Sequence, residues 1–267
     1  MVYTRLDSQE TYNMEQIQYD DKLHRYSFRG TRYLSATQVL DLVKPKFEAE
    51  EIAEQYAKKA GRTKEDWLDT WDDIRDASLD RGNAIHNMHE YIINNRSIDV
   101  VHGRPLRVRN PELFPHLSLK DYPDGVYTER IVWDHRFQIA GRCDKFAIET
   151  VKDKRYVHID DYKTNRLIRF TSYHDKEKGY KMLLPPLAHL MACEAVVYNL
   201  QLSLYMHMFM CQGFHPGNMR IIHFPHIPKM APPGARQPDP VVYDMKFLHD
   251  DILTLLRYYK TLKPKAA

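Results

Sequence analysis

The sequence is poor in cysteine and has no long apolar segment. Its three cysteines, Cys143, Cys193 and Cys211, lie far apart among 267 residues. An odd count without pairs at metal-ligand spacing argues against a disulfide framework and against a zinc or iron–sulfur site. No apolar run approaches the roughly 18 residues needed to cross a bilayer, and the polar start MVYTRLDSQE lacks the pattern of a secretory signal. We therefore expect a protein of the reducing cytoplasm with no membrane partner.

An excess of charge of one sign is also missing. Lysine and arginine number 39, aspartate and glutamate 36, and the formal net charge is +3. This balance neither requires nor excludes a nucleic-acid partner, because metal-binding carboxylates cancel basic residues in the sum. With 43% hydrophobic and 28% charged residues, the composition is typical of a globular protein. The length fits one domain with insertions, or one and a half domains.

The hydrophobic pattern predicts helices first and strands later. Residues 16–34 read as a small β-meander, and Ser35–Gln38 is a capping-box pattern that predicts the start of a helix to about Val43. A second helix is expected over 47–59, ended by Gly61. A further capping-type start at Thr63–Asp66 predicts a helix that continues, with or without a break, to about Asn95.

Residues 102–125 contain four prolines and little periodicity, which predicts a long loop or insertion. Short strands with tight connections follow, then a long helix that Gly213 should end, a strand, a proline-rich loop and a last helix. In order, these are strands at 127–133, 137–141, 143–149 and 156–163, a helix at 187–211, a strand at 219–224, a loop at 225–240 and a helix at 246–262. We expect an α/β fold with a mixed sheet and a helical N-terminal part.

The segment YVHIDDYKT, residues 156–164, contains the strongest chemical signal. Side chains alternate across a strand, so Asp161 and Lys163 should share one face and Asp160 the other. A carboxylate beside an ammonium at a strand end can hold a divalent cation and offset charge that develops on a phosphate. The plainer alternative is a surface ion pair.

Three other segments complete the candidate site. GRCD places Asp144 where a hairpin could bring it beside Asp161, unless it is only a turn residue. RGNAIHNMHE places His86 and Glu90 one helical turn apart, and QLSLY does the same for Gln201 and Tyr205. The last pair could equally be the polar edge of a packed helix. His89 we take as a bystander.

Together these four segments resemble the PD-(D/E)XK nuclease superfamily, in particular its RecB-like and phage-type exonuclease branch. The likeness covers roughly residues 34–210 and includes LSATQVL near the N-terminus. It implies a restriction-endonuclease-like mixed β-sheet core flanked by helices, with residues 1–34 as an N-terminal meander and 35–267 as the nuclease domain. It also implies the cytoplasm of a bacterial or phage-infected cell, with roles in DNA recombination, repair or phage DNA processing.

The resemblance also implies the roles of the site residues. One or two Mg²⁺ or Mn²⁺ ions would be held by His86, Asp144, Asp161 and the carbonyl of Tyr162, with Glu90 and Glu129 as further acidic candidates. Lys163 would be the catalytic lysine, and Gln201 and Tyr205 would contact nucleic acid beside the scissile phosphate. No iron–sulfur cluster is expected, because the four cysteines that some relatives use are missing.

The predicted activity is metal-dependent hydrolysis of DNA phosphodiesters, single- or double-stranded, by an exonuclease. Alternatives are a structure-selective endonuclease with the same site, a non-catalytic DNA-binding or recombination scaffold on this fold, and an unrelated metal hydrolase. A recombinase or single-strand-binding protein is a further expected partner. Basic residues that could follow a phosphate backbone, or simply be solvated, are Arg104, Arg107, Arg109, Arg166 and Arg169.

Overall fold

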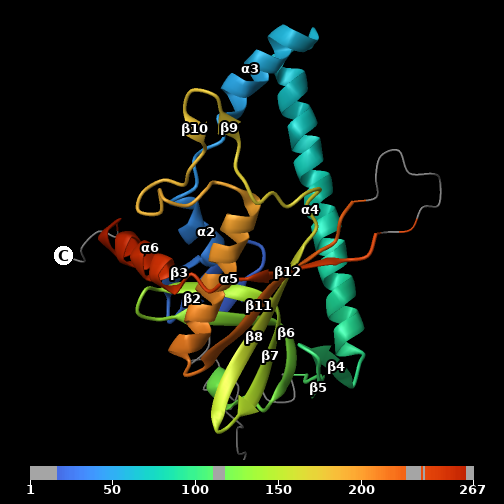
Figure 1. Cartoon of the computed structure of the whole chain (residues 1–267), viewed down its shortest axis with the longest axis vertical. Coiled ribbons are helices and arrows are strands. Elements are labelled where there is room, and N and C mark those ends of the chain that lie inside the picture. The colour runs from blue at the N-terminus through green and yellow to red at the C-terminus, as the bar shows by residue number, and fades with distance from the viewer. Residues whose placement is uncertain (1–16, 111–117, 227–235, 237, 263–267) are drawn as a thin grey trace, which may run out of the picture.

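The structure is a computed structural model that describes residues 17–110, 118–226, 236 and 238–262. A mixed sheet of eight strands lies at its centre, with helices on both faces (Figure 1). Its strands follow the order β1-β2-β3-β7-β8-β11-β12, and β6 pairs with β7. They are β1 (Gln18–Asp20), β2 (Arg25–Phe28), β3 (Thr31–Ser35), β6 (Gly125–Asp134), β7 (Ile139–Val151), β8 (Lys154–Lys163), β11 (His215–His223) and β12 (Val241–Met245). The predicted α/β class with a mixed sheet is confirmed.

The N-terminal meander is part of the main sheet. Strands β1, β2 and β3 pair antiparallel, and β3 then pairs in parallel with the start of β7, where Leu34 lies opposite Ile139. Residues 1–16, including the first position of the predicted meander, lie outside the described residues.

Two groups of elements cover the two faces of the sheet. On one face, α2 (Ala36–Asp41), α5 (Glu194–Cys211) and α6 (His249–Leu262) enclose the larger core. On the other face, α4 (Lys64–Asn94) and the hairpin of β4 (Ile98–Val101) and β5 (Arg104–Arg107) enclose a smaller core that includes Val126, Ala147 and Tyr162. The chain therefore buries both faces of its central strands. None of the helices described is both long and apolar enough to span a membrane.

Local sequence signals at the helix ends are confirmed. The side chain of Ser35 accepts a hydrogen bond from the backbone N–H of Gln38, and the side chain of Gln38 accepts one from the backbone N–H of Ser35. Thr63 and Asp66 form the same reciprocal box at the start of α4. Helix α3 (Ala49–Ala60) ends at Gly61, whose left-handed conformation is the usual one for a helix end.

Several predicted boundaries are wrong for physical reasons. The two strands expected at 137–141 and 143–149 are one strand, β7, because the pairing with β6 continues through Arg142 and Cys143. The long helix begins at Glu194 rather than 187, with turns between, and the last helix begins at His249 rather than 246. Strand β12 lies at the edge of the sheet and was missed. Residues 227–235 and 237 of the predicted proline-rich loop lie outside the described residues.

The predicted loop at 102–125 is structured in part. Residues 104–107 form β5, in which Pro105 pairs with Val100 of β4. A proline is tolerated there because the hairpin is a separate two-stranded sheet with edge strands only. The 3₁₀ turn Leu119–Asp121 and the start of β6 occupy its far end, and 111–117 lie outside the described part of the chain. The remaining short pair is β9 (His174–Asp175) with β10 (Gly179–Tyr180).

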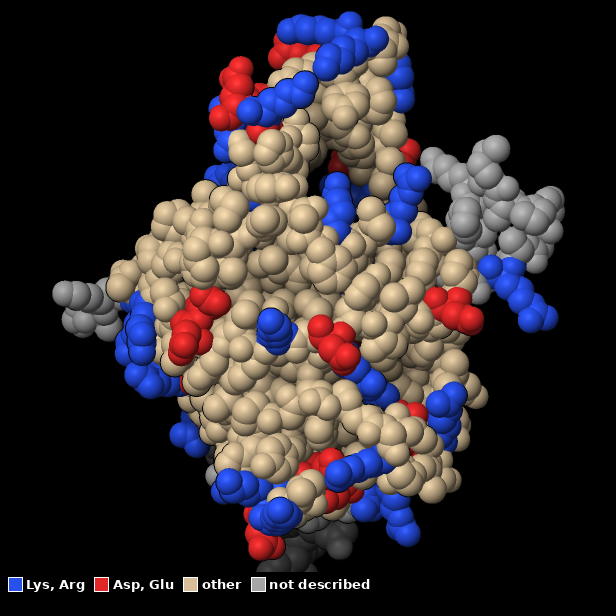
Figure 2. All heavy atoms as spheres, in the orientation of Figure 1, with Lys and Arg blue, Asp and Glu red and all other residues tan. Residues whose placement is uncertain are grey.

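Helix α3 and the N-terminal part of α4 form an arm that projects from the body (Figure 1). Helix α4 is unbroken over 31 residues. Near the tip, the rings of Phe47 and Tyr56 pack against Trp67 and Trp71 of α4. Lys and Arg side chains gather at this tip (Figure 2). Lys58 and Lys64 form ion pairs with Glu54 and Glu50 of α3. Residues 72–80 of α4 are exposed, so this stretch of the helix separates the packed tip of the arm from the body.

Candidate active site

The hairpin of β7 and β8 brings the two predicted aspartates together. Lys145 pairs with Asp160, so Asp144 and Asp161 are the next residues to lie opposite each other. The backbone N–H of Tyr162 donates to Oδ2 of Asp144 at 2.8 Å, and Nζ of Lys163 lies 2.5 Å from Oδ2 of Asp161. Asp144 therefore lies within a strand and is not a turn residue.

Asp160 faces the opposite side of the sheet, as its position in the strand predicts. Arg220 of β11 donates to both its oxygens at 2.8 and 3.0 Å, and Lys145 lies 3.1 Å away. Burial alone would raise the pKa of Asp160, but the hydrogen bonds and charges of Arg220 and Lys145 hold it below its usual value. Asp160 is thus a compensated buried charge, whereas Asp161 faces α5 and the site.

His86 enters the site from α4. Its Nδ1 lies 3.5 Å from Oδ2 of Asp144, and its Nε2 lies 3.2 Å from the carbonyl oxygen of Tyr162. Ligand atoms of His86, Asp144 and Glu129 all lie within 4.8 Å of one another, so these three could hold a metal ion. His89 packs instead between the rings of Tyr162 and Phe224.

Glu129 has a larger place in the site than its sequence context suggests. It lies on β6 opposite Asp144, between the pairs Thr128–Lys145 and Arg130–Cys143. Its backbone has a φ of 51°, a left-handed conformation that is rare for a residue with a side chain and that is often found at functional sites. Arg142 binds its Oε2 at 2.9 Å.

Strand β7 is irregular at the same point. Cys143, Phe146 and Ile148 all belong to the core cluster under α5, so the alternation of side chains shifts by one residue near Asp144. The irregular backbone of β6 and β7 therefore directs the carboxylates of Glu129 and Asp144 toward His86.

Burial and neighbouring negative charge raise the pKa of two acidic groups in the site. Burial, and next the charge of Asp161, raise the pKa of Asp144 to about 6. Burial, and next the charge of Asp144, raise the pKa of Glu129 to about 8, and Glu90 contributes to that shift. The site therefore concentrates negative charge that its own cations do not fully balance.

Helix α5 supplies the opposite wall. Gln201 accepts a hydrogen bond from Nζ of Lys163 at 3.3 Å and donates from Nε2 to Asp161 at 3.4 Å and to the Tyr205 hydroxyl at 3.1 Å. Nζ of Lys163 also lies 4.7 Å from the ring centre of Tyr198. Tyr198 was missed in the sequence, although it precedes Gln201 and Tyr205 at i, i+3, i+7 spacing on one helical face.

Gly141 allows α5 to approach the sheet this closely. A Cβ atom at this position would lie 2.5 Å from Cε1 of Tyr205. Any larger residue would push away the ring that positions Gln201. The glycine of GRCD thus has a steric role in the site rather than a role in a turn.

Lys163 is held as a cation. Burial would lower the pKa of its ammonium, but the charges of Asp161 and Asp144 outweigh burial and raise it. An ammonium at this position can donate hydrogen bonds and stabilise negative charge, whereas it has no lone pair with which to accept a proton.

These residues line one cleft of about 940 Å³, bounded on one side by the arm helix α4. Among the predicted site residues, those that line it are His86, Glu90, Glu129, Asp144, Tyr162, Lys163 and Tyr205. Asp161 and Gln201 are not among its lining residues, but both contact Lys163, which is. Glu90 lines the cleft without joining the group of His86, Glu129 and Asp144.

The donor set fits a hard divalent cation. Carboxylate oxygens predominate, with one imidazole, as Mg²⁺ and Mn²⁺ prefer. Oδ2 of Asp161 is buried beside Nζ of Lys163, which neutralises it as an ion pair. The clustered carboxylates of Glu129 and Asp144 supply further negative charge that a bound cation would balance.

The predicted basic residues divide into two sets. Arg104 pairs with Glu149 and Arg169 with Glu194, so both have acidic partners within the chain. Arg166 lines the cleft. A second hollow of about 730 Å³ shares Glu90 with the cleft and is lined by Arg96, Arg107, Arg109 and Arg130. Among the described residues, ion pairs therefore account for Arg104 and Arg169 of the predicted set, whereas Arg107, Arg109 and Arg166 line the two hollows.

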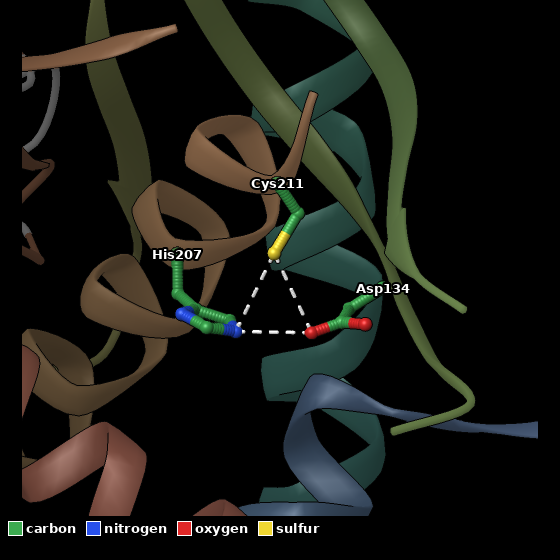
Figure 3. Close-up of side chains that lie close together, drawn as sticks. All are labelled: Asp134, His207 and Cys211. Carbon is green, nitrogen blue, oxygen red and sulfur yellow. Dashed lines mark hydrogen bonds and ion pairs between the residues drawn. The ribbon is translucent and has the colours of Figure 1, made fainter. Parts of the chain in front are cut away.

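A second group of side chains that could hold a metal ion lies at the C-terminal end of α5. Asp134, His207 and Cys211 point toward one another (Figure 3). None of the three lines the cleft.

No protein-family model matches the chain, and no curated protein matches it. Among solved structures, the crystal structure of SSO0001 is similar, with a TM-score of 0.36 and 13% identity over 86% of this chain and 76% of that chain. A likeness at this level assigns neither a fold family nor a function.

Proposed function

We propose that the protein is a metal-dependent nuclease, an exonuclease that hydrolyses DNA phosphodiester bonds, on a restriction-endonuclease-like core. The main support is the convergence of four sequence segments in one cleft. His86, Asp144, Lys163 and Gln201 come from two helices and two strands, yet each lies within hydrogen-bond or ion-pair distance of another site residue. A packed helix edge or a surface ion pair would not require that arrangement.

Asp144, Glu129 and His86 would hold the divalent ion, with Asp161 and the Tyr162 carbonyl beside them. A bound Mg²⁺ or Mn²⁺ would polarise the scissile phosphate and activate water at neutral pH. Irregular strands and hydrogen bonds hold these groups before any ligand arrives, which lowers the cost of binding it.

Lys163 and Gln201 would act on the phosphate rather than the metal. The Lys163 ammonium lies at the strand end between Asp161 and the Gln201 amide, where it can stabilise charge on the phosphoryl oxygens. The Gln201 amide oxygen orients the ammonium, and Tyr205 orients the amide through its hydroxyl. Loss of Gln201 or Tyr205 would displace the ammonium and loss of Lys163 would remove it, in each case without removing a metal ligand.

The arginine-lined hollow would continue the path of the substrate strand. It meets the cleft at Glu90, and Nε of Arg130 is buried there without a hydrogen-bond partner among the described residues. Guanidinium groups bind phosphate through paired N–H donors. A strand with its scissile phosphate beside Lys163 could thus place a neighbouring phosphate against Arg107 and Arg130.

Cleavage assays on defined substrates test this function. End-labelled linear and closed circular DNA, single- and double-stranded, and matched RNA are incubated with Mn²⁺, with Mg²⁺ and with chelator, beside Asp161→Asn. We expect metal-dependent loss of linear DNA and intact circles. Cleavage of circles would support the structure-selective endonuclease instead, and cleavage of RNA alone would change the substrate class. Binding of DNA without cleavage under every metal condition would support the scaffold and overturn the proposal.

A further inference from the structure

The cluster of Asp134, His207 and Cys211 connects two elements that are distant in sequence. Asp134 is the last residue of β6, whereas His207 and Cys211 lie one turn apart at the C-terminal end of α5. An i, i+4 pair of this kind places both ligand atoms on one side of a helix. All three side chains converge on one point (Figure 3).

The three ligand atoms have the spacing of one face of a zinc tetrahedron. Nε2 of His207 lies 3.0 Å from Oδ2 of Asp134, and Sγ of Cys211 lies 3.5 Å from that oxygen and 3.7 Å from that nitrogen. At tetrahedral angles, an oxygen and a nitrogen each about 2.0 Å from one zinc ion stand roughly 3.3 Å apart, and a sulfur at about 2.3 Å stands roughly 3.5 Å from either. The triangle therefore needs only small adjustments to accept an ion.

The surroundings hold the oxygen ligand in place. Oδ1 of Asp134 accepts hydrogen bonds from the backbone N–H groups of Arg136 and Phe137 at 2.7 and 3.3 Å, which leaves Oδ2 directed at His207. Asp134 and His207 are buried, with 3% and 7% of their surfaces exposed, whereas Cys211 is exposed. Such outer hydrogen bonds orient metal ligands in known sites.

We propose that Asp134, His207 and Cys211 form a zinc site, distinct from the cleft, that fastens the end of β6 to the end of α5. The mixed oxygen, nitrogen and sulfur donors favour zinc over the Mg²⁺ or Mn²⁺ suited to the cleft. Cys211 binds as a thiolate and releases its proton to solvent, and water completes the coordination on its exposed side. The isolated cysteines led us to expect no zinc site from the sequence, because a site with one cysteine and a ligand 73 positions before His207 leaves no local spacing pattern.

Cobalt substitution tests the site in the whole 267-residue chain. Co²⁺ bound to a thiolate has a charge-transfer band in the near ultraviolet, which carboxylate and imidazole ligands do not produce. We add Co²⁺, then Zn²⁺, to metal-free protein in saturating Mg²⁺, and measure zinc affinity with a chromophoric chelator. The variants are Cys211→Ser, the matched control Cys193→Ser, and Asp161→Asn, which alters only the cleft. Circular dichroism checks that each is folded.

We expect one zinc per chain, a cobalt band that zinc abolishes, and a higher melting temperature with zinc. Cys211→Ser should lose the band and weaken zinc binding more than about tenfold, because a ligand is gone. Cys193→Ser and Asp161→Asn should keep both. Absence of the band in the unaltered protein, or its persistence in Cys211→Ser, would overturn the proposal. A band lost in Cys193→Ser but not in Cys211→Ser would place the ion elsewhere and overturn it as well.

Discussion

Helix α5 contributes to two clusters that differ in how their charges are balanced. Toward its middle, Gln201 donates to Asp161, which lies opposite Asp144, an acid whose pKa burial and the charge of Asp161 raise to about 6. At its end, His207 faces Asp134, where burial is outweighed by the hydrogen bonds with His207 and with the backbone N–H groups of Arg136 and Phe137, so the pKa of the acid falls. Both clusters could hold a metal, but only the first retains unbalanced negative charge and a lysine.

The difference favours the cleft as the site of the proposed chemistry. Groups whose charges are satisfied within the fold stabilise it, whereas unbalanced groups in an open cleft cost stability and are typical of reactive sites. The contrast recurs inside one dipeptide, because Asp160 has two cations beside it, Arg220 and Lys145, whereas Asp161 shares the single cation Lys163 with Asp144. Substitutions in the cleft and at the compensated Asp160 should therefore affect different properties, the first mainly the cleavage rate and the second mainly stability.

The largest effect is expected from the aspartates of the cleft. Asp144→Asn and Asp161→Asn should each lower the cleavage rate by a factor on the order of 10³ or more, because each removes charge that binds the cation. Their zinc affinity at the other cluster should not change. Single-turnover rates at saturating Mn²⁺, beside zinc titrations, measure both. A near-normal rate in either variant would show that the wrong carboxylate was chosen.

Asp160→Asn is the matched control. It leaves Arg220 and Lys145 without their shared anion, which should cost about 3 kcal/mol of unfolding free energy or more. The rate per folded molecule should be little changed, since Asp160 faces away from the cleft. Chemical denaturation and cleavage on the same preparation distinguish the two aspartates.

Lys163→Ala should have the next largest effect. The rate should fall roughly 10²- to 10³-fold, because the ammonium stabilises charge that develops in the transition state. Metal affinity should change little, because Lys163 is not a ligand. Rates over a range of Mn²⁺ concentrations separate the two effects. Weak metal binding with a normal rate at saturation would contradict the role.

A smaller loss is expected from Gln201→Ala and Tyr205→Phe. These side chains position Lys163 through hydrogen bonds of 3.3 and 3.1 Å, and small displacements of reacting groups can cost about 100-fold in rate. Metal titrations should stay near those of the unaltered protein. If α5 is plain core instead, melting temperatures fall while the rate per folded molecule is unchanged.

Local rules predicted much of the fold and of the site. Capping boxes and Gly61 located helix ends, and strand alternation separated Asp161 from Asp160. Tertiary contacts were beyond such rules. The importance of Glu129 depends on an irregular backbone opposite Asp144, and the role of Gly141 depends on a ring from a helix more than 60 residues away. Strand β12 is held at the sheet edge by β11, which its short sequence alone does not indicate.

The smallest effect concerns stability without metal, and its sign differs between the two aspartates of the hairpin. The raised pKa of Asp144, about 6, means that the fold disfavours its ionised form. Its contribution to stability is therefore complete below the unfolded value near 4 and is lost as pH rises through about 6. Asp144→Asn cannot ionise, yet its amide oxygen can still accept the hydrogen bond from Tyr162.

In chelator, Asp144→Asn should therefore become more stable than the unaltered protein as pH rises from 4 to 7, by on the order of 1 to 3 kcal/mol. Asp160 has a lowered pKa, so its contribution is present above the unfolded value and is lost as pH falls through the folded one. Asp160→Asn should accordingly be less stable at pH 7, with the gap closing in acid. Added Mn²⁺ should stabilise the unaltered protein more than Asp144→Asn, because the cation offsets the charge. Urea unfolding at several pH values measures all three proteins, and a destabilised Asp144→Asn at pH 7 in chelator would mean that the cleft is already balanced without a cation.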